Sequence, residues 1–282
     1  MNSLPKDSTT QFCICIGAKK AGTTWLYRCL QEHPDIRCSP TKEPHYFSKH
    51  YNEYEFVEYL KIVDAQATAD IVYESSVSYL ADFNTPARIM EHLPSVKLVL
   101  ILRNPVERAF SDYCHFVTKG YISAGTPISI AVEAQPEILN NSLYGKHLSR
   151  YLEFFDTEQL HIIKYEDLSA RPQEVLDHLC GFLNIKTFSP SIVDKKYHST
   201  QARLHPLYFR LNRLYLKLRK NALGQLLIRC LRSCGINGMT LEKIFSRTSS
   251  NKLCLSEKDR KWLSNHFIED QKKLSRLLDQ WD

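Results

Sequence analysis

The chain has 282 residues, 43% of them apolar and 24% charged, which is typical of a folded protein with one large domain or two small ones. A chain of this composition can bury a large core, so a disordered protein, a collagen and a disulfide-stapled miniprotein are excluded. The formal net charge of +6 is compatible with anionic ligands. It is too small to indicate a nucleic-acid partner by itself, and none is expected.

The first buried strand is expected at residues 12–17, followed by a glycine-bearing loop and a helix that ends before Pro34. Along the chain, strand and helix patterns continue to alternate up to residue 185, which predicts an α/β fold. We expect a central parallel sheet of about four or five strands flanked by helices. Further strands are predicted at residues 71–74, 97–103 and 160–165, and further helices at residues 84–92, 105–118, 142–155 and 172–183.

Residues 186–282 show no strand pattern, and we expect a helical segment that completes a single domain spanning residues 1–282. Residues 203–232 are rich in Lys and Arg, lack acidic residues and carry leucines at helical spacing, which predicts a basic amphipathic helix or helix pair. Its partner would be an acidic acceptor, a carrier protein or an anionic surface, although a solvated helix face is the simpler interpretation. Ser256 and Asp259 resemble a capping box and predict a last helix that ends near Leu278.

No apolar run reaches the ~18 residues that a membrane span needs, so no span is expected. Residues 1–11 lack the apolar stretch of a signal peptide. The nine cysteines are an odd number and form no Cys-x-x-Cys pair. We therefore expect buried, reduced thiols in a cytoplasmic protein, and no zinc site is predicted.

The first motif with chemical content is Gly17-x-x-x-x-Gly22-Thr23-Thr24, between the first strand and its helix. Glycines let the backbone approach a phosphate, and the amides and dipole of a helix N-terminus favour negative charge. A nucleotide triphosphatase carries lysine directly after the second glycine, whereas here Lys20 lies inside the loop. The motif predicts an anion site, with a plain glycine turn as the alternative.

The second motif joins Arg103, where a strand is expected to end, with Ser111, two turns into the next helix. The arginine offers a bidentate fork and the serine a hydroxyl donor, so both could bind one phosphate. Alone, the pair is equally compatible with a surface arginine and a serine on a helix face. Two anion sites on neighbouring strand–helix units suit a nucleotide with two separate phosphate groups.

The stretches GAKKAGTTWLYRCLQEHPDI and KLVLILRNPVERAFSDY resemble the sulfotransferases that use 3′-phosphoadenosine 5′-phosphosulfate (PAPS). The resemblance covers about residues 12–185 and is closest to the heparan-sulfate and bacterial branch. It implies a P-loop-like sheet, PAPS as co-substrate without a metal, and transfer of the sulfuryl group to an acceptor hydroxyl. It also implies that Arg103 and Ser111 bind the 3′-phosphate. The residues implied to bind the 5′-phosphosulfate are Lys19, Lys20, Ala21, Gly22, Thr23, Thr24 and Trp25.

By the same resemblance, Glu43 in the sequence KEPH is the base that accepts the proton of the acceptor hydroxyl, and Lys20 stabilises charge on the leaving group. His45 is the alternative base, although its two-residue offset is expected to turn it away. A loop carboxylate paired with Lys42 is the simpler interpretation of Glu43. Glu74 is expected to line the acceptor pocket, or else to be a solvated carboxylate at a strand end.

Where heparan-sulfate enzymes often have a lysine after the residue matching Glu74, this chain has Ser75, which weakens the inference of a sulfated polysaccharide acceptor. The acceptor class stays open between a glycan and a small molecule such as a lipid or natural-product alcohol. The resemblance also implies that Tyr144 approaches the adenine and that Arg203, in the loop near residues 198–203, covers the nucleotide. A core tyrosine and a polar linker are the alternatives.

Two other classes of protein share parts of this pattern. A nucleotide kinase or ATPase would use the same loop, but Thr23 stands where its lysine should be. A non-catalytic nucleotide-binding module would tolerate a degenerate site, yet Lys20, Glu43, Arg103 and Ser111 are all present. The sulfotransferase interpretation therefore accounts for more of the residues.

Overall fold

The computed structural model describes residues 10–65, 70–123, 125–193 and 253–279. The chain divides into two compact units, which are described separately. The first contains Met1–Arg108, Leu139–Tyr197 and His266–Asp282, and the second contains Ala109–Ile138 and His198–Asn265. The expectation of a single domain stays a prediction. Arg203 and the basic stretch 203–232 lie outside the described residues.

The first unit is built on a five-stranded sheet with the order β2-β3-β1-β4-β5, in which every pairing is parallel. The α/β class and the parallel sheet are thus confirmed. The strands are β1 (Gln11–Gly17), β2 (Ile36–Cys38), β3 (Ile71–Ser75), β4 (Lys97–Leu102) and β5 (Leu160–Lys164). Because β1 and β4 are neighbours and parallel, the loop after Gly17 and the residue Arg103 leave the sheet at the same edge.

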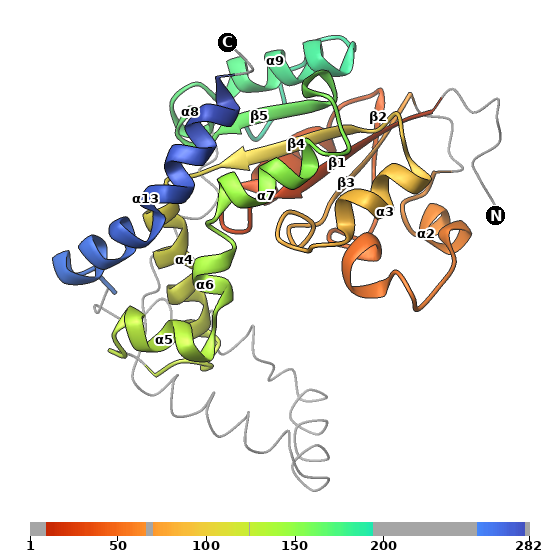
Figure 1. The fold of residues 1–282 in the computed structure, drawn as a ribbon. Coiled ribbons are helices and arrows are strands. Elements are labelled where there is room, and N and C mark those ends of the chain that lie inside the picture. The colour runs from red at the N-terminus through yellow and green to blue at the C-terminus, as the bar shows by residue number, and fades with distance from the viewer. Residues whose placement is uncertain (1–9, 66–69, 124, 194–252, 280–282) are drawn as a thin grey trace, which may run out of the picture. The chain divides into compact units, whose positions relative to one another are not determined.

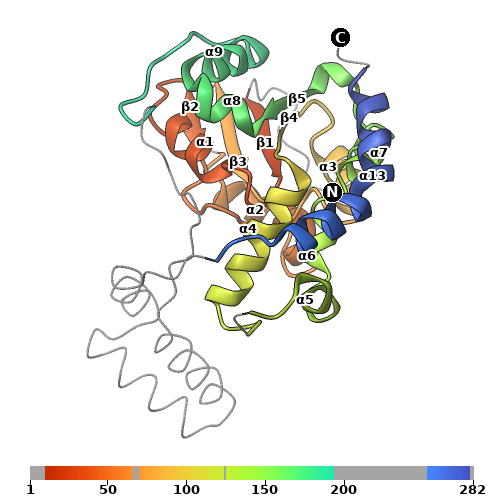
Figure 2. The ribbon, with the colours of Figure 1, turned by 90° about the vertical axis from the view of Figure 1, so that its left-hand side faces the viewer.

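Helices cover both faces of this sheet, as Figures 1 and 2 show. One face carries α1 (Thr23–Leu30), α8 (Tyr165–Ala170) and α9 (Pro172–Leu183), and the other carries α3 (Thr85–His92) and α7 (Tyr144–Tyr151). Covering on both faces explains why the central strands are continuously apolar: five of the six β4 residues are buried. The shorter elements are α2 (Phe56–Ile62) and the single turns Tyr46–His50 and Thr157–Gln159.

α4 (Pro105–Thr118) follows β4 and begins where the sequence predicts. The side chain of Asn104 caps it, since Oδ1 accepts hydrogen bonds from the amides of Val106 at 3.0 Å and Glu107 at 3.2 Å. From Ala109 onward α4 belongs to the second unit. That unit also contains α5 (Ile128–Ala134), the first half of α6 (Glu137–Asn140) and the first part of α13 (Glu257–Leu278).

The predicted cap of α13 is present, because the amide of Asp259 donates to the Ser256 hydroxyl at 3.0 Å. Farther along, α13 enters the first unit and caps α7. Asp270 accepts hydrogen bonds from the amides of Gly145 at 2.9 Å and Lys146 at 2.8 Å. A Cβ on Gly145 would lie 2.5 Å from the carbonyl oxygen of Asp270, so only glycine lets the two backbones approach this closely.

Candidate active site

The loop between β1 and α1 has the local geometry of an anion site. Gly22 is the N-cap of α1 with φ of 90°, and no side chain among the described residues caps this helix. The first amides of α1 therefore keep the capacity to bind an anion. A Cβ on Gly22 would lie 3.0 Å from Leu168 Cδ1 of α8, and the positive φ itself disfavours any residue other than glycine here.

The side chains predicted for this loop are placed unequally. Lys19 and Lys20 are half-buried and Thr24 is exposed. Lys20 has a left-handed φ of 69°, a conformation that residues other than glycine adopt rarely and that often marks functional sites. By contrast, the side chains of Thr23, Ala21 and Trp25 are buried. Ala21 and Trp25 pack in the hydrophobic core, so they could contact a ligand only through their backbone atoms.

Arg103 leaves the end of β4 and reaches the first loop. Its Nη1 donates a hydrogen bond to the carbonyl oxygen of Lys20 at 2.9 Å, and its guanidinium lies 4.7 Å from the centre of the Tyr165 ring. These two contacts join the two predicted anion-binding motifs within the first unit. A cation held in this way is pre-positioned for a phosphate.

Ser111 lies on α4, in the part of that helix that belongs to the second unit. Its side chain is only 5% exposed, and its hydroxyl oxygen has no hydrogen-bond partner among the described residues. The serine therefore lies on a buried part of the α4 surface. A buried hydroxyl without a partner is costly, and an anionic ligand would satisfy it.

Glu43 lies in the loop after β2, and its two carboxylate oxygens have different partners. Lys42 Nζ contacts Oε1 at 2.6 Å, and His45 Nε2 lies 3.4 Å from Oε2. Burial by itself would raise the pKa of Glu43, but the hydrogen bonds from His45 and Lys42 and their charges lower it to about 2. The expected Lys42 pair is thus present, and it lies in the same cluster as His45.

His45 does not turn away from Glu43, so the expectation based on its two-residue offset is wrong. Both residues adopt left-handed backbone conformations, with φ of 64° at Glu43 and 56° at His45, which bring the two side chains together. The His45 amide donates to Ser76 Oγ at 3.0 Å, and its Nδ1 lies 2.7 Å from Ser78 Oγ. The turn after β3 therefore holds this loop in place.

Glu74, near the end of β3, is buried with an exposed fraction of 1%, which contradicts the alternative of a solvated carboxylate. Burial raises its pKa to about 8, so the carboxyl group is mostly protonated at neutral pH. Ser76 Oγ donates to Oε2 at 3.2 Å, while Oε1 has no partner among the described residues. Glu74 is thus joined through Ser76 to the backbone of His45.

Tyr144 begins α7 and is 1% exposed, within the core of the first unit. Burial raises its pKa to about 12. The nearby charge of Arg108 and a hydrogen bond with the backbone of Arg103 act on this pKa in the opposite direction. Tyr144 is therefore a core tyrosine at the place where the resemblance expects an adenine contact, and both roles remain compatible.

The sequence reasoning missed three serines near Glu43: Ser48, Ser76 and Ser78. Two of them, Ser76 and Ser78, alternate in the stretch SVS directly after β3, and alternating hydroxyl residues beside a predicted base were the available signal. Their importance depends on the turn geometry, which the sequence pattern does not reveal.

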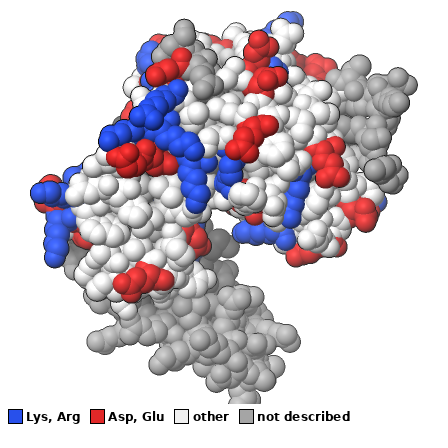
Figure 3. Space-filling model, in the orientation of Figure 1, with Lys and Arg blue, Asp and Glu red and all other residues white. Residues whose placement is uncertain are grey.

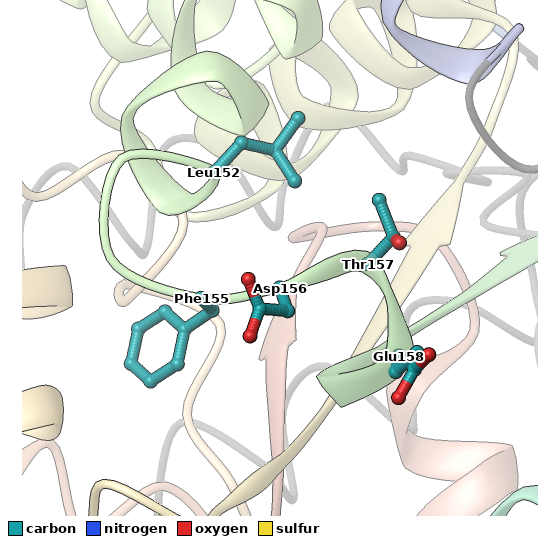
Figure 4. Close-up of a pocket in the computed structure, with 5 residues that line it drawn as sticks. All are labelled: Leu152, Phe155, Asp156, Thr157 and Glu158. Atoms are coloured by element: carbon teal, nitrogen blue, oxygen red, sulfur yellow. The ribbon is translucent and has the colours of Figure 1, made fainter.

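A pocket of about 410 Å³ lies elsewhere in the first unit (Figure 4). The residues that line it come from the chain between α7 and β5, and they are Leu152, Phe155, Asp156, Thr157 and Glu158. Two of them, Asp156 and Glu158, carry carboxylates. The pocket shares no residue with the loop site. Figure 3 shows basic and acidic side chains interspersed on the face it presents, so no large surface of one sign is seen there.

None of the described helices has the length and apolar character that crossing a membrane requires. Within the described ranges, no cluster of His, Cys, Asp and Glu residues has the arrangement of a metal site.

Comparison with known proteins gives a consistent result. The family model described as "Sulfotransferase domain" matches residues 11–214. Heparan sulfate glucosamine 3-O-sulfotransferase 3B1 of Mus musculus is 29% identical over 200 residues, which cover 68% of this chain and 50% of that protein. Heparan sulfate glucosamine 3-O-sulfotransferase 5 of Mus musculus is 32% identical over 183 residues, or 61% of this chain and 53% of that protein. The chain thus spans about half the length of these curated relatives.

Among solved structures, a sulfotransferase from Alicyclobacillus acidocaldarius is similar with a TM-score of 0.58 and 30% identity, covering 71% of this chain and 91% of that one. Mouse sulfotransferase SULT7A1 complexed with PAP has a TM-score of 0.52 at 13% identity, with 97% and 88% of the two chains covered, and shows the shared fold. Because the family model covers well over half of its length, the chain belongs to the sulfotransferase family.

Proposed function

We propose that the protein is a PAPS-dependent O-sulfotransferase that transfers the sulfuryl group to an acceptor hydroxyl and releases 3′,5′-ADP. The observation that carries the proposal is the contact of Arg103 with the carbonyl oxygen of Lys20. It joins a phosphate-type loop to a second cation at the carboxyl edge of β1 and β4, where parallel sheets bind nucleotides.

In this proposal the amides of the first loop and the hydroxyl groups of Thr23 and Thr24 bind the 5′-phosphosulfate. Arg103 and Ser111 bind the 3′-phosphate, as the resemblance implies, and the buried hydroxyl of Ser111 supports that role. Lys20 stabilises the charge that builds on the bridging oxygen as the leaving group departs. Arg203 keeps its predicted role over the nucleotide, and Tyr144 its predicted approach to the adenine.

The acceptor oxygen attacks sulfur, the bond between sulfur and the bridging oxygen breaks, and that electron pair leaves on 3′,5′-ADP. Glu43 takes the acceptor proton. With a pKa of about 2, Glu43 is ionised across the physiological range but is a weak base. It suits a reaction in which the hydroxyl becomes acidic only as the new bond forms.

The acceptor is proposed to be a neutral hydroxyl compound, either a glycan or a small molecule. Two relatives named above are heparan sulfate sulfotransferases, which supports a sugar hydroxyl. Ser75, fully buried after Glu74, supplies no cation for a sulfated polymer. A cytoplasmic location stays a prediction.

The test is incubation of the protein with PAPS labelled in the sulfuryl group and a panel of sugar, lipid and small alcohol acceptors. Appearance of label in an acceptor, together with 3′,5′-ADP and without added Mg²⁺, supports the proposal. Turnover of ATP that requires Mg²⁺ would instead indicate a kinase or ATPase. Tight binding of 3′,5′-ADP without transfer to any acceptor would indicate a non-catalytic binding module.

A further inference from the structure

A chain of hydrogen bonds leads from the turn after β3 to the carboxylate of Glu43. Ser48 Oγ lies 2.8 Å from Ser78 Oγ, and Ser78 Oγ lies 2.7 Å from His45 Nδ1. On the other side of the ring, His45 Nε2 lies 3.4 Å from Glu43 Oε2. Three side chains in sequence thus connect to the group that the proposed function uses as base.

The positions of the protons follow from the chemistry of the groups. An ionised carboxylate can only accept a hydrogen bond, so a neutral His45 facing Glu43 must carry its proton on Nε2. Nδ1 is then an acceptor, and the Ser78 hydroxyl must donate to it. The Ser78 oxygen then accepts from the hydroxyl of Ser48, whose single proton is in this arrangement not shared with the His45 carbonyl oxygen 3.3 Å away. Every donor in the chain is directed toward Glu43.

The backbone around this chain is held by the same turn. The amide of Glu43 donates to the carbonyl oxygen of Ser75 at 3.1 Å, and the amide of His45 donates to Ser76 Oγ at 3.0 Å. These contacts support the two left-handed conformations at Glu43 and His45. The loop is therefore fixed at its backbone, and the ring of His45, with its side chain 16% exposed, is fixed at Nδ1 by Ser78.

We propose that Ser78 is a positioning residue: its hydroxyl fixes neutral His45 in the Nε2–H tautomer and directs that N–H at Glu43 Oε2. The carboxylate is thereby aimed before the acceptor arrives, with Lys42 holding its other oxygen. The inference rests on the proposed function, because Glu43 needs to be aimed only if it takes the acceptor proton. Ser48 supports Ser78 and acts one contact farther away.

The first experiment reads the tautomer directly. Protein labelled with ¹⁵N-histidine is examined by NMR at alkaline pH, where imidazoles are neutral, and His45 is assigned by the signals lost in His45→Gln. Wild-type protein and Ser78→Thr are expected to show a proton on Nε2, whereas Ser78→Ala is expected to show a mixture of tautomers. Ser264→Ala removes the same atom from an exposed position on α13 and is expected to change nothing.

The second experiment measures single-turnover transfer from PAPS and binding of 3′,5′-ADP. Ser78→Ala is expected to slow transfer roughly 10-fold, the value of one hydrogen bond of about 1.4 kcal/mol, while nucleotide affinity stays unchanged. Ser78→Thr is expected to transfer at the wild-type rate, and Ser48→Ala is expected to slow transfer less than Ser78→Ala does. A variant that transfers slowly but has the same thermal unfolding temperature as the wild-type protein is still folded.

The two proposals fail in different ways. A wild-type proton on Nδ1, or an unchanged tautomer and unchanged transfer in Ser78→Ala, overturns the role of Ser78 and leaves the sulfotransferase proposal standing. Absence of 3′,5′-ADP binding and of transfer, with the tautomer shift still present in Ser78→Ala, contradicts the sulfotransferase proposal and leaves the geometric assignment standing.

Discussion

The guanidinium of Arg103 and the backbone carbonyl of Lys20 are hydrogen-bonded at 2.9 Å, although 83 positions separate them in the chain. Arg103 therefore has two uses in the proposed site. It offers its remaining donors to the 3′-phosphate, and it supports the loop that carries Lys20. Loss of Arg103 should therefore lower the affinity for nucleotides with a 3′-phosphate more than the affinity for nucleotides without one.

Arg103→Ala is expected to weaken binding of 3′,5′-ADP by roughly 10- to 150-fold, the value of one lost charge-assisted contact. Binding of 5′-AMP should fall much less, because only the support of the loop is lost. Calorimetric titration of both nucleotides measures the difference, with Arg276→Ala on the exposed surface of α13 as the control. Equal losses for the two ligands would remove Arg103 from the 3′-phosphate site.

Lys20→Ala and Glu43→Gln are expected to slow transfer for different reasons. Lys20→Ala removes the charge that stabilises the leaving group, so transfer slows even at saturating PAPS. Glu43→Gln keeps the shape but loses the base, which is worth typically ~10²–10⁴-fold, and 3′,5′-ADP affinity should hardly change. Single-turnover transfer beside a binding titration separates the two effects.

The pH profile adds a constraint to the same experiment. The contacts with His45 and Lys42 lower the pKa of Glu43 to about 2, so we expect any loss of activity between pH 4 and pH 7 to come from another group. If Glu43→Gln retains full transfer while His45→Ala abolishes it, histidine is the base. If both variants remain active, Glu74 is the next residue to examine.

Glu74 is expected to make stability fall as pH rises. Its pKa is raised to about 8 in the folded protein, against 4.5 for an ordinary glutamate, so the protonated form is favoured by folding. This contribution is complete below pH 4.5 and is lost progressively up to pH 8, by an amount of the order of a few kcal/mol. Glu74→Gln should remove this slope in urea unfolding followed across pH. Glu153→Gln, on an exposed residue, should retain it.

Gly145→Ala and Gly181→Ala are expected to change stability in opposite directions. The added Cβ at residue 145 would lie 2.5 Å from the Asp270 carbonyl oxygen and 2.8 Å from the Leu274 amide, which forces backbones apart and costs about 1–3 kcal/mol. At residue 181, within α9, a Cβ meets nothing within 4 Å, and alanine should stabilise the helix by up to about 1 kcal/mol. Denaturant unfolding of both variants measures the difference.

The central strands could be predicted because burial on both faces leaves a clear apolar signal. β1 and β4 are such runs, and the start of α4 is indicated by the capping residue Asn104 and by Pro105 at the first helical position. β2 was missed because it has only three residues and its middle residue, Arg37, is exposed. The predicted helix 142–155 is shorter than expected, since α7 ends at Tyr151 and the chain then turns to bury Phe155.

Only the part of the candidate site that lies within short sequence motifs could be predicted. The first loop and Arg103 follow from residue type and spacing, whereas Glu43 follows from the resemblance to the sulfotransferases. The meeting of His45 with Glu43 depends on two left-handed residues, and L side chains adopt that conformation too rarely for a pattern to predict it. The raised pKa of Glu74 depends on burial from several elements at once, which no local pattern contains.

Asp270 caps α7 from a position 125 residues farther along the chain than Gly145. A chain made from its N-terminus toward its C-terminus has all five strands available once Lys164 has emerged, long before Asp270 exists. Until then the first amides of α7 lack this partner. The helix that starts with Tyr144 is therefore among the last parts of the first unit to be completed during synthesis, and a chain cut short before Asp270 would keep its strands and lose this cap.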